Sequence, residues 1–391
     1  MPNLDKLKHG LIDAAESLRG ALTSMSDDFY RNPETGLEEK KTSSEMQAFL
    51  EKYGFTVEAG VAGMPTAFRA GLGKGRPVIA LLAEMDALPG IGHGCGHNIA
   101  GTASIGAAAA LSEVLRGLDW SGTVLVLGTP AEELGKGKIE MINAGVFNTV
   151  DAAMMVHGSS RRTVVKHFLG LTRLNFTFRG RSSHASAYPE EGINALDAVI
   201  QTFNAISALR QQMRGDCKVH GIITEGGKAP NIIPELASAS FYVRSKDLKE
   251  LASLKERVVN CAKGAAIATG CSLDVREEGE TNAPMKLNAA FADAYRGALK
   301  VLGLPEDTQA PGRNVGSSDI GNVSQAVPAL HPHVPIRQGI NIHTREFADA
   351  TVTVDGHRAL MEGVKTLGLT VLELLFNART LDEVKKDFLT E

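Results

Sequence analysis

Apolar runs of strand length alternate with helix-length segments through the first part of the chain. The run PVIALLAEM at 77–85 is too short for a helix and is closed by Asp86, and the run GTVLVLGT at 122–129 has the same character. Between them, residues 100–115 are rich in alanine, which favours a helix whose small side chains can pack closely on a sheet. This alternation predicts an α/β domain with a mainly parallel sheet.

A different pattern begins near residue 170. The predicted elements there follow the order strand, helix, strand, strand, helix, strand, and the first of these helices is the long amphipathic segment 192–214. This order matches the ferredoxin-like α+β unit. The α/β pattern then resumes, so we predict a discontinuous domain formed by residues 1–169 and 285–391, with a second domain inserted at 170–284.

Charge and cysteine content exclude several classes of protein. The net charge is -4 and the basic residues are scattered, which gives no footprint for nucleic acid. We find neither the apolar core of a signal peptide at the N-terminus nor the roughly 18 unbroken apolar residues of a membrane span. Four cysteines do not make a disulfide framework in a chain of 391 residues. We expect a soluble, cytoplasmic protein.

Residues that commonly bind metal ions recur where the predicted strands end. In GIGHGCGHN, at 90–98, the glycines allow a tight loop in which a thiolate and an imidazole can point at one spot. Sites in open α/β sheets form outside the carboxyl ends of the strands. The donors placed there are Glu84, Asp86, Cys95, His97, Glu132, Glu133, His157 and, far downstream in a similar setting, His343. Cysteine, histidine and carboxylate together form the ligand set of zinc and other divalent metals.

The neighbours Glu132 and Glu133 are expected to take separate roles. One carboxylate can bind a metal ion, and the other can accept a proton from a water molecule whose pKa the metal lowers. This division of roles is typical of metal-assisted hydrolysis. The residues alone leave open which glutamate has which role.

Six motifs between about residues 78 and 348 resemble the aminoacylase/carboxypeptidase family of dinuclear metallopeptidases, peptidase family M20, in that family's order. The motifs are MDALPGIGHGCGHN, TPAEELGKGK, RGRSSHASAYPEEGINALDA, APNIIPELASASFYVRS, GSSDIGNVSQAVPALHP and INIHTREF. The branch that the chain resembles most is that of the aminobenzoyl-glutamate hydrolases and dipeptidase-like proteins. The resemblance implies a zinc-peptidase-like catalytic domain and an inserted dimerisation (lid) domain, and hence a homodimer.

The resemblance also implies a role for each site residue. The implied metal ligands are Cys95, His97, Glu133, His157 and His343, with Cys95 bridging two ions. Glu132 would be the general base, and Asp86 would orient a ligand or the base. His184 of the inserted domain would reach the partner subunit's site and stabilise the oxyanion, while Asn231 and Arg244 would contact substrate. Glu84 stands where many members have a metal-binding histidine, so the number of ions per subunit, one or two, stays open.

Three functions are compatible with this pattern. The first is an amidohydrolase that uses metal-activated water to cleave an N-acyl amino acid, a dipeptide or an aminobenzoyl-amino acid. The second keeps the metal but releases ammonia from an amino-aromatic or related small molecule, as an aminohydrolase (deaminase). The third is an inactive metal-binding regulatory protein. A thiolate ligand favours zinc, with manganese, cobalt or nickel as alternatives.

Overall fold

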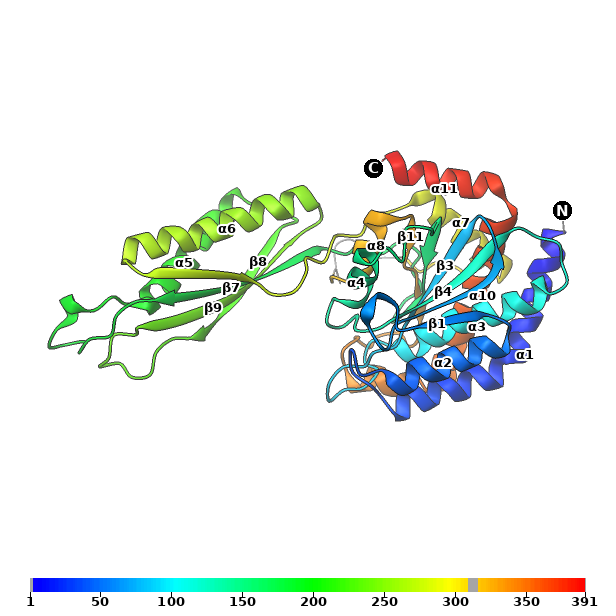
Figure 1. The fold of residues 1–391 in the computed structure, drawn as a ribbon, viewed down its shortest axis with the longest axis horizontal. Coiled ribbons are helices and arrows are strands. Elements are labelled where there is room, and N and C mark those ends of the chain that lie inside the picture. Colours follow the sequence, from blue (N-terminus) through cyan, green and yellow to red (C-terminus); the bar gives the residue numbers. More distant parts are fainter. Residues whose placement is uncertain (1–2, 309–315, 391) are drawn as a thin grey trace. The chain divides into compact units, whose positions relative to one another are not determined.

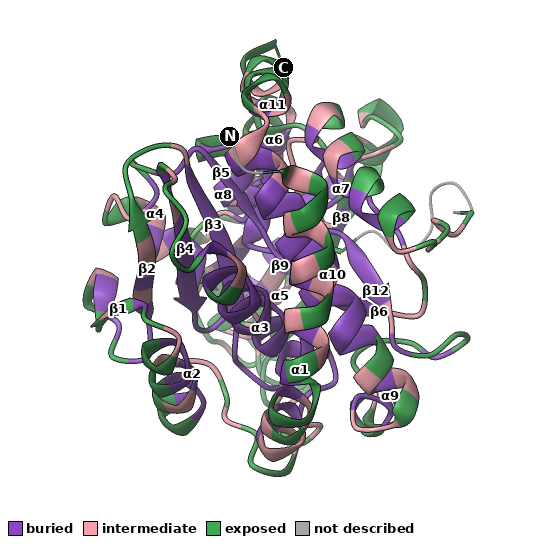
Figure 2. Ribbon diagram, turned by 90° about the vertical axis from the view of Figure 1, so that its right-hand side faces the viewer, coloured by how far each residue is buried: buried purple, intermediate pink, exposed green. Residues whose placement is uncertain are grey.

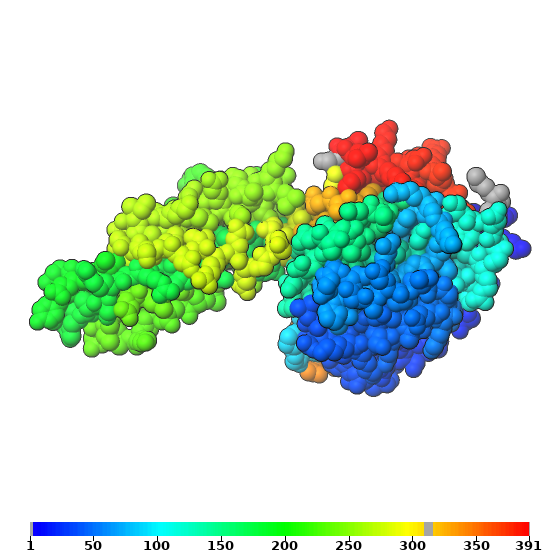
Figure 3. Space-filling view, viewed as in Figure 1, coloured from blue at the N-terminus to red at the C-terminus, as the bar shows by residue number. Residues whose placement is uncertain are grey.

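The computed structural model describes residues 3–308 and 316–390, and these residues form two compact units. Unit 1 consists of the described residues of Met1–His167, Met285–Asn314 and Ser318–Glu391, and unit 2 consists of those of Phe168–Pro284 and Val315–Ser317. Figure 3 shows that segments from both ends of the chain, coloured blue and red, build unit 1 together.

Unit 1 contains helices and strands from both sides of the insertion (Figure 1). Its helices are α1 (Leu4–Arg31), α2 (Lys40–Lys52), α3 (His97–Leu115), α4 (Gly137–Asn143), α7 (Ala289–Val301), α8 (Ile320–Ala326), α9 (Arg345–Ala350), α10 (Val354–Phe376) and α11 (Ala378–Thr390). Its strands are β1 (Thr56–Ala59), β2 (Phe68–Lys74), β3 (Val78–Glu84), β4 (Gly122–Thr129), β5 (Ala152–Met154), β6 (His157–Ser159), β11 (Ala329–Leu330) and β12 (His333–Pro335). Among the described helices, none combines the length and the apolar character that a membrane span requires.

The main sheet of unit 1 has the strand order β1-β2-β4-β3-β5-β11. Strand β3 pairs in parallel with both β4 and β5, and β11 pairs in parallel with β5, whereas β1 and β2 add an antiparallel edge. Every residue of β3 is buried, as expected for a central strand that is covered on both faces. The predicted α/β class with a mainly parallel sheet is therefore confirmed.

Helix α3 packs against β3 and β4, and α1 and α10 pack against α3 (Figure 2). The alanine and glycine residues of α3 permit this close approach, and almost the whole of α3 is buried. Gly101 marks the tightest point, because a Cβ atom there would overlap the carbonyl oxygen of Glu84 and lie 2.6 Å from Met46 Cε. Since His97 begins the helix one turn before Gly101, this contact fixes His97 beside the end of β3.

Unit 2 has the predicted order of strands and helices. Its elements are β7 (Gly170–Arg179), α5 (Ala195–Leu209), β8 (Lys218–Glu225), β9 (Leu236–Ser245), α6 (Leu248–Thr269) and β10 (Ser272–Glu277). The four strands form an antiparallel sheet in the order β10-β7-β9-β8, and α5 and α6 pack together on one of its faces. This topology is that of a ferredoxin-like α+β unit.

Replacing Gly101 with alanine is expected to destabilise unit 1. The new methyl group would overlap the backbone of Glu84, which cannot move aside as the end of the Met46 side chain can, so we expect a loss of about 3 kcal/mol, the upper part of the range for overpacked cores. The matched control is Gly297→Ala on α7, where a Cβ atom would find nothing within 4 Å. That change should stabilise by about 0.5–1 kcal/mol. Calorimetric melting of both variants checks the pair, and equal melting temperatures would contradict the close-contact argument.

Candidate metal centre

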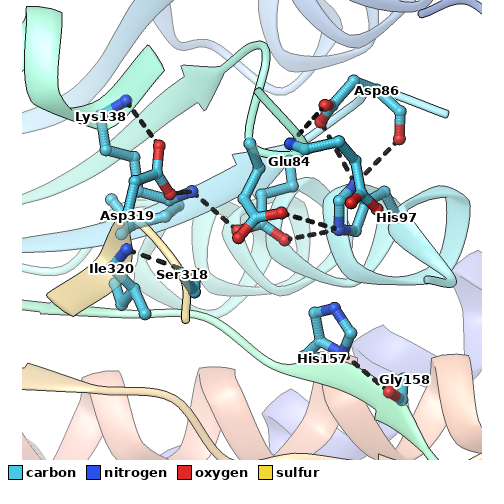
Figure 4. Close-up of polar contacts among 12 residues, drawn as sticks. Glu84, Asp86, His97, Lys138, His157, Gly158, Ser318, Asp319 and Ile320 are labelled. Carbon is cyan, nitrogen blue, oxygen red and sulfur yellow. Dashed lines mark hydrogen bonds and ion pairs between the residues drawn. The ribbon is translucent and has the colours of Figure 1, made fainter. Parts of the chain in front are cut away.

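The glycine-rich loop and two strand ends bring several predicted donors together in unit 1 (Figure 4). Asp86 lies two residues beyond β3, and Glu132 lies in the turn that follows β4. Cys95 precedes α3, and His97 is the first residue of that helix. Gly96 between them has a φ of 76°, a left-handed conformation that glycine adopts without strain. The loop can therefore reverse direction between the thiol and the imidazole.

Two histidines occupy settings that differ from the strand ends predicted for them. His157 begins strand β6 and does not end the preceding strand, because β5 stops at Met154 and β6 pairs separately with β12. His343 does not follow a strand: it lies in a bend before α9 with a φ of 64°, and its backbone N–H donates to the carbonyl of Gly94, 2.8 Å away. This hydrogen bond ties His343 to the glycine-rich loop.

The predicted ligands form two groups that share Cys95. Ligand atoms of Cys95, His97 and His157 all lie within 4.8 Å of one another, and so do those of Cys95, Glu133 and His343. A residue common to two groups is where a bridging ligand would be expected. The donors of the first group are largely buried, whereas His343 is exposed, so the second group opens toward solvent.

Asp86 fixes the orientation of the His97 ring. Nδ1 of His97 lies 2.8 Å from the backbone oxygen of Asp86 and 3.2 Å from Oδ1 of its side chain. Because both neighbours are acceptors, Nδ1 carries the proton and Nε2 is left to coordinate a metal ion. The other carboxylate oxygen of Asp86 accepts a hydrogen bond from the backbone N–H of Glu133, at 2.9 Å, so one carboxylate holds two of the donors.

Several buried polar atoms point into this centre without a hydrogen-bond partner among the described residues. They are Oε2 of Glu84, Nε2 of His97 and Oε1 of Glu133. Buried polar groups are normally satisfied, so these atoms are suited to bind a cation. Together with a thiol and a second imidazole, the donors fit one or two divalent metal ions.

The electrostatics of the donors fit the same conclusion. Burial lowers the pKa of His157 to about 4, so its ring is neutral near pH 7 and can coordinate. Burial, reinforced by the carboxylate of Glu133, raises the pKa of the Cys95 thiol well above its usual range. A cation is therefore needed to stabilise the thiolate in this negatively charged surrounding.

The adjacent glutamates face different neighbours. Oε2 of Glu133 lies 4.0 Å from Nε2 of His343, and Oε2 of Glu132 lies 4.0 Å from Nε2 of His97. Burial raises the pKa of Glu132 well above its usual range, and the carboxylates of Glu84 and Asp319 add to this effect. Glu133 thus belongs to the donor group that includes His343, and both glutamates also form a third candidate group with His97. The raised pKa makes the carboxylate of Glu132 a stronger proton acceptor than an exposed one.

Sequence reasoning missed two charged residues beside this centre. The buried ammonium of Lys138 lies 2.7 Å from Glu84 and 2.6 Å from Asp319. Lys138 occurs in the motif TPAEELGKGK and Asp319 in the motif GSSDIGN, so both positions lie in stretches already singled out. A buried lysine has no local signature, however, and only its distant partners reveal its role.

Unit 2 holds the three remaining predicted residues. His184 and Asn231 lie in neighbouring segments, because the N–H of Ala185 donates to the carbonyl of Asn231. Arg244, on β9, donates to Oγ of Ser317 at 2.8 Å. Nδ1 of His184 accepts from the backbone N–H of Ala187 at 3.2 Å, so in the neutral ring its exposed Nε2 carries the proton.

Several known proteins resemble this chain in sequence and in fold. The profile of Peptidase family M20/M25/M40 matches residues 80–371. Mouse Xaa-Arg dipeptidase is 35% identical over 98% of this chain and 93% of its own length. A p-aminobenzoyl-glutamate hydrolase subunit from Escherichia coli K12 is 28% identical over 96% of this chain and 93% of its own length. A dinuclear metal-binding peptidase of family M20 from Bacillus subtilis has a TM-score of 0.72 and 22% identity, covering 92% of this chain and 99% of its own.

The fold and the donor set define a metal-dependent hydrolase. The chain belongs to Peptidase family M20/M25/M40, since the family profile spans most of it and the mouse relative matches nearly its full length. The expected family and enzyme class are thereby confirmed, and the protein is a metallo-amidohydrolase of this family.

Removal of the shared thiol should lower metal affinity. We expect Cys95→Ala to bind zinc at least about tenfold more weakly than the wild type, since removing even a group that only orients a ligand costs that much. Chelator competition with purified protein measures the change. Cys217→Ala is the control, because Cys217 is a buried cysteine of unit 2. Equal zinc affinity in both variants would remove Cys95 from the metal centre.

Proposed function

We propose that this chain hydrolyses the amide bond of an N-acyl amino acid, a dipeptide or an aminobenzoyl-amino acid. The observation that carries the proposal is the pair of donor groups that share Cys95 and lie beside Glu132. The names of two relatives, a dipeptidase and an aminobenzoyl-glutamate hydrolase, support this substrate class. Each of those substrates carries a free carboxylate next to the scissile amide.

The metal ions would be held by the two donor groups. The proposed ligands are Cys95, His97, Glu133, His157 and His343, and the thiolate favours zinc over manganese, cobalt or nickel. When bound, the metal polarises the scissile carbonyl and lowers the pKa of water towards neutrality. Asp86 holds the His97 ring with Nε2 turned to the ion, as its two contacts with Nδ1 indicate.

Glu132 would move the proton that hydrolysis requires. Its carboxylate lies 4.0 Å from Nε2 of His97, so it would lie beside the ion, and it belongs to neither donor group that contains Cys95. It would accept the proton of the attacking water and pass it to the nitrogen that leaves. The products would be a carboxylic acid and an amine.

Residues of unit 2 would bind the substrate. The exposed Nε2–H of His184 is a donor suited to the developing oxyanion. Arg244 presents a guanidinium that can pair with a substrate carboxylate, and Asn231 lies next to the His184 segment. We infer that His184 serves the site of a partner subunit.

An edge strand supports the proposal of a homodimer. Strand β8 ends the sheet of unit 2, and the side chains of Ile222 and Ile223 on it are 65% and 46% exposed. Such an edge invites pairing with another strand, and a second copy of the chain would cover it symmetrically. We also propose a cytoplasmic location, since metal binding requires a reduced Cys95 and the four cysteines are free thiols.

A substrate panel tests the proposed reaction. Zinc-loaded protein is incubated with N-acyl amino acids, dipeptides, aminobenzoyl-glutamate and amino-aromatics, and products are read by mass spectrometry. We expect a carboxylic acid and an amine from at least one amide. Ammonia release without an acid product would favour the deaminase alternative, and metal-loaded protein without turnover would favour a regulatory role.

The matched control for the panel is Glu132→Gln. This variant keeps the size of the side chain but cannot accept a proton, so turnover should fall by about 10²–10⁴-fold while zinc content stays at the wild-type level. The same substitution at the neighbouring residue, Glu133→Gln, should lower both turnover and zinc affinity. A loss of less than about tenfold in Glu132→Gln at saturating zinc would remove Glu132 from the role of base.

Mixed dimers test the inference that His184 acts in the partner's site. One subunit carries His184→Ala and the other carries Glu132→Gln. If His184 acts across the dimer, one site has both defects and the other has neither, so roughly half of the wild-type activity returns. If it acts within its own subunit, each site keeps one defect and activity stays near zero. A fully active monomer would also contradict the inference.

A further inference from the structure

Lys138 is a fully buried lysine whose ammonium lies between two buried carboxylates. Its Nζ donates to Oε1 of Glu84 at 2.7 Å and to Oδ1 of Asp319 at 2.6 Å (Figure 4). The backbone N–H of Lys138 also donates to Oδ2 of Asp319, at 3.0 Å. Asp319 therefore holds the lysine at two points, its backbone N–H and its ammonium, and Glu84 accepts a further hydrogen bond from the ammonium.

The backbone around Lys138 is built to place it there. Lys138 lies in the first turn of α4, and α4 packs against α8, which Asp319 precedes. The residue before it, Gly137, approaches the backbone so closely that a Cβ atom would overlap the carbonyl oxygen of Pro130. The start of α4 is thereby drawn up to the segment that follows β4, which also carries Glu132.

Three carboxylates meet at this point. Oxygen atoms of Glu84, Glu132 and Asp319 lie within 4.8 Å of one another, which is an arrangement of hard oxygen donors that suits a divalent cation. Here the ammonium of Lys138 already contacts two of the three side chains. Burying such a cluster without a counter-charge would be costly, so the lysine acts as a cation that is tethered to the chain.

The tethered cation determines which oxygen of Glu84 remains available. Since Lys138 takes Oε1, Oε2 is turned to Nε2 of His97, 3.2 Å away. Neither Oε2 nor Nε2 has a hydrogen-bond partner among the described residues, and when Nε2 binds a metal ion the ring carries its proton on Nδ1, beside Asp86. Two lone pairs thus face one space. Two ligand atoms that each bind the same ion at about 2.0–2.2 Å are separated from each other by a distance similar to the 3.2 Å between Oε2 and Nε2.

We propose that Lys138 is a positioning residue of the metal centre, whose ammonium occupies the Glu84–Glu132–Asp319 cluster and keeps Glu84 Oε2 directed at the metal ion that His97 binds. The inference rests on the proposed function in one respect, that His97 is a ligand. Lys138 itself touches neither the metal nor the substrate. Its effect reaches the metal through Glu84, and Asp319 holds the lysine in place.

A charge-balanced pair of substitutions tests the proposal. Lys138→Met alone would leave buried carboxylates without a counter-charge and is expected to impair folding. The double variant Lys138→Met/Asp319→Asn removes one charge of each sign, so the net charge of the cluster is unchanged. We expect it to fold, as judged by circular dichroism, and to bind zinc about tenfold or more weakly in chelator competition. The matched control, Lys41→Met/Asp28→Asn, removes an exposed 2.6 Å ion pair and should leave affinity within about twofold of wild type.

Adding Glu84→Gln shows whether Lys138 acts through Glu84. If it does, Glu84→Gln alone weakens zinc binding, and combining it with the double variant causes little further loss, because both changes remove the same interaction. Additive losses would overturn the proposal, as would a double variant that binds zinc as tightly as the wild type. A wild-type protein that binds no zinc would instead contradict the proposed function on which the inference rests.

Chemical rescue gives a measurement that would not change if Lys138 had a purely structural role. Lys138→Ala leaves space for a small ammonium ion, which also supplies the counter-charge that the buried carboxylates of this variant lack. The variant is therefore refolded with each additive, and cobalt(II) absorption reports the ligands around the metal. We expect propylammonium to restore the wild-type cobalt spectrum and affinity, and propanol, of similar size but uncharged, to leave both unchanged. Equal effects of the two additives would show that the space and not the charge matters, and would overturn the proposal.

Discussion

The balance of buried charge at the end of β3 is the constraint on which the rest of the site depends. Glu84, Asp86 and Asp319 are all buried there, and an unpaired buried carboxylate costs several kcal/mol. Lys138 neutralises part of this charge through its ion pairs with Glu84 and Asp319, and the ring of His97 lies against the other oxygen of Glu84. A divalent ion would complete the balance, because the groups that remain unpaired are negatively charged or carry lone pairs. The same field opposes a free thiolate at Cys95, which links the charge of the thiol to metal occupancy.

Close packing converts this charge balance into fixed geometry. Gly101 lets α3 touch the backbone at the end of β3, and His97 occupies the first turn of the same helix. Gly137 performs the equivalent task for α4 and Lys138. Two glycines at close approaches therefore set the distance between an imidazole, a carboxylate and an ammonium that lie far apart in the sequence. Catalytic groups need such fixed supports, because small displacements of a ligand weaken both metal binding and catalysis.

Much of the fold and of the donor set could be predicted from the sequence. The alternation of apolar runs with helical segments determined the α/β class, because burial on both faces of a parallel sheet demands that pattern. The order of elements in 170–284 likewise indicated the ferredoxin-like topology of unit 2. The closely spaced Cys95 and His97 indicated a metal centre because their chemistry and their glycine neighbours are local properties.

What the sequence could not determine depends on contacts between distant segments. His157 was expected at a strand end, but pairing of β6 with β12 decided its setting, and a hydrogen bond to Gly94 decided that of His343. Lys138 is one of 41 basic residues and looks like a surface lysine until Glu84 and Asp319, 54 and 181 positions away, are placed beside it. Residue types and local spacing thus determined the chemistry available to this protein. Only the tertiary structure decided which charges share one dry space, because electrostatic energy depends on distance and burial and not on separation along the chain.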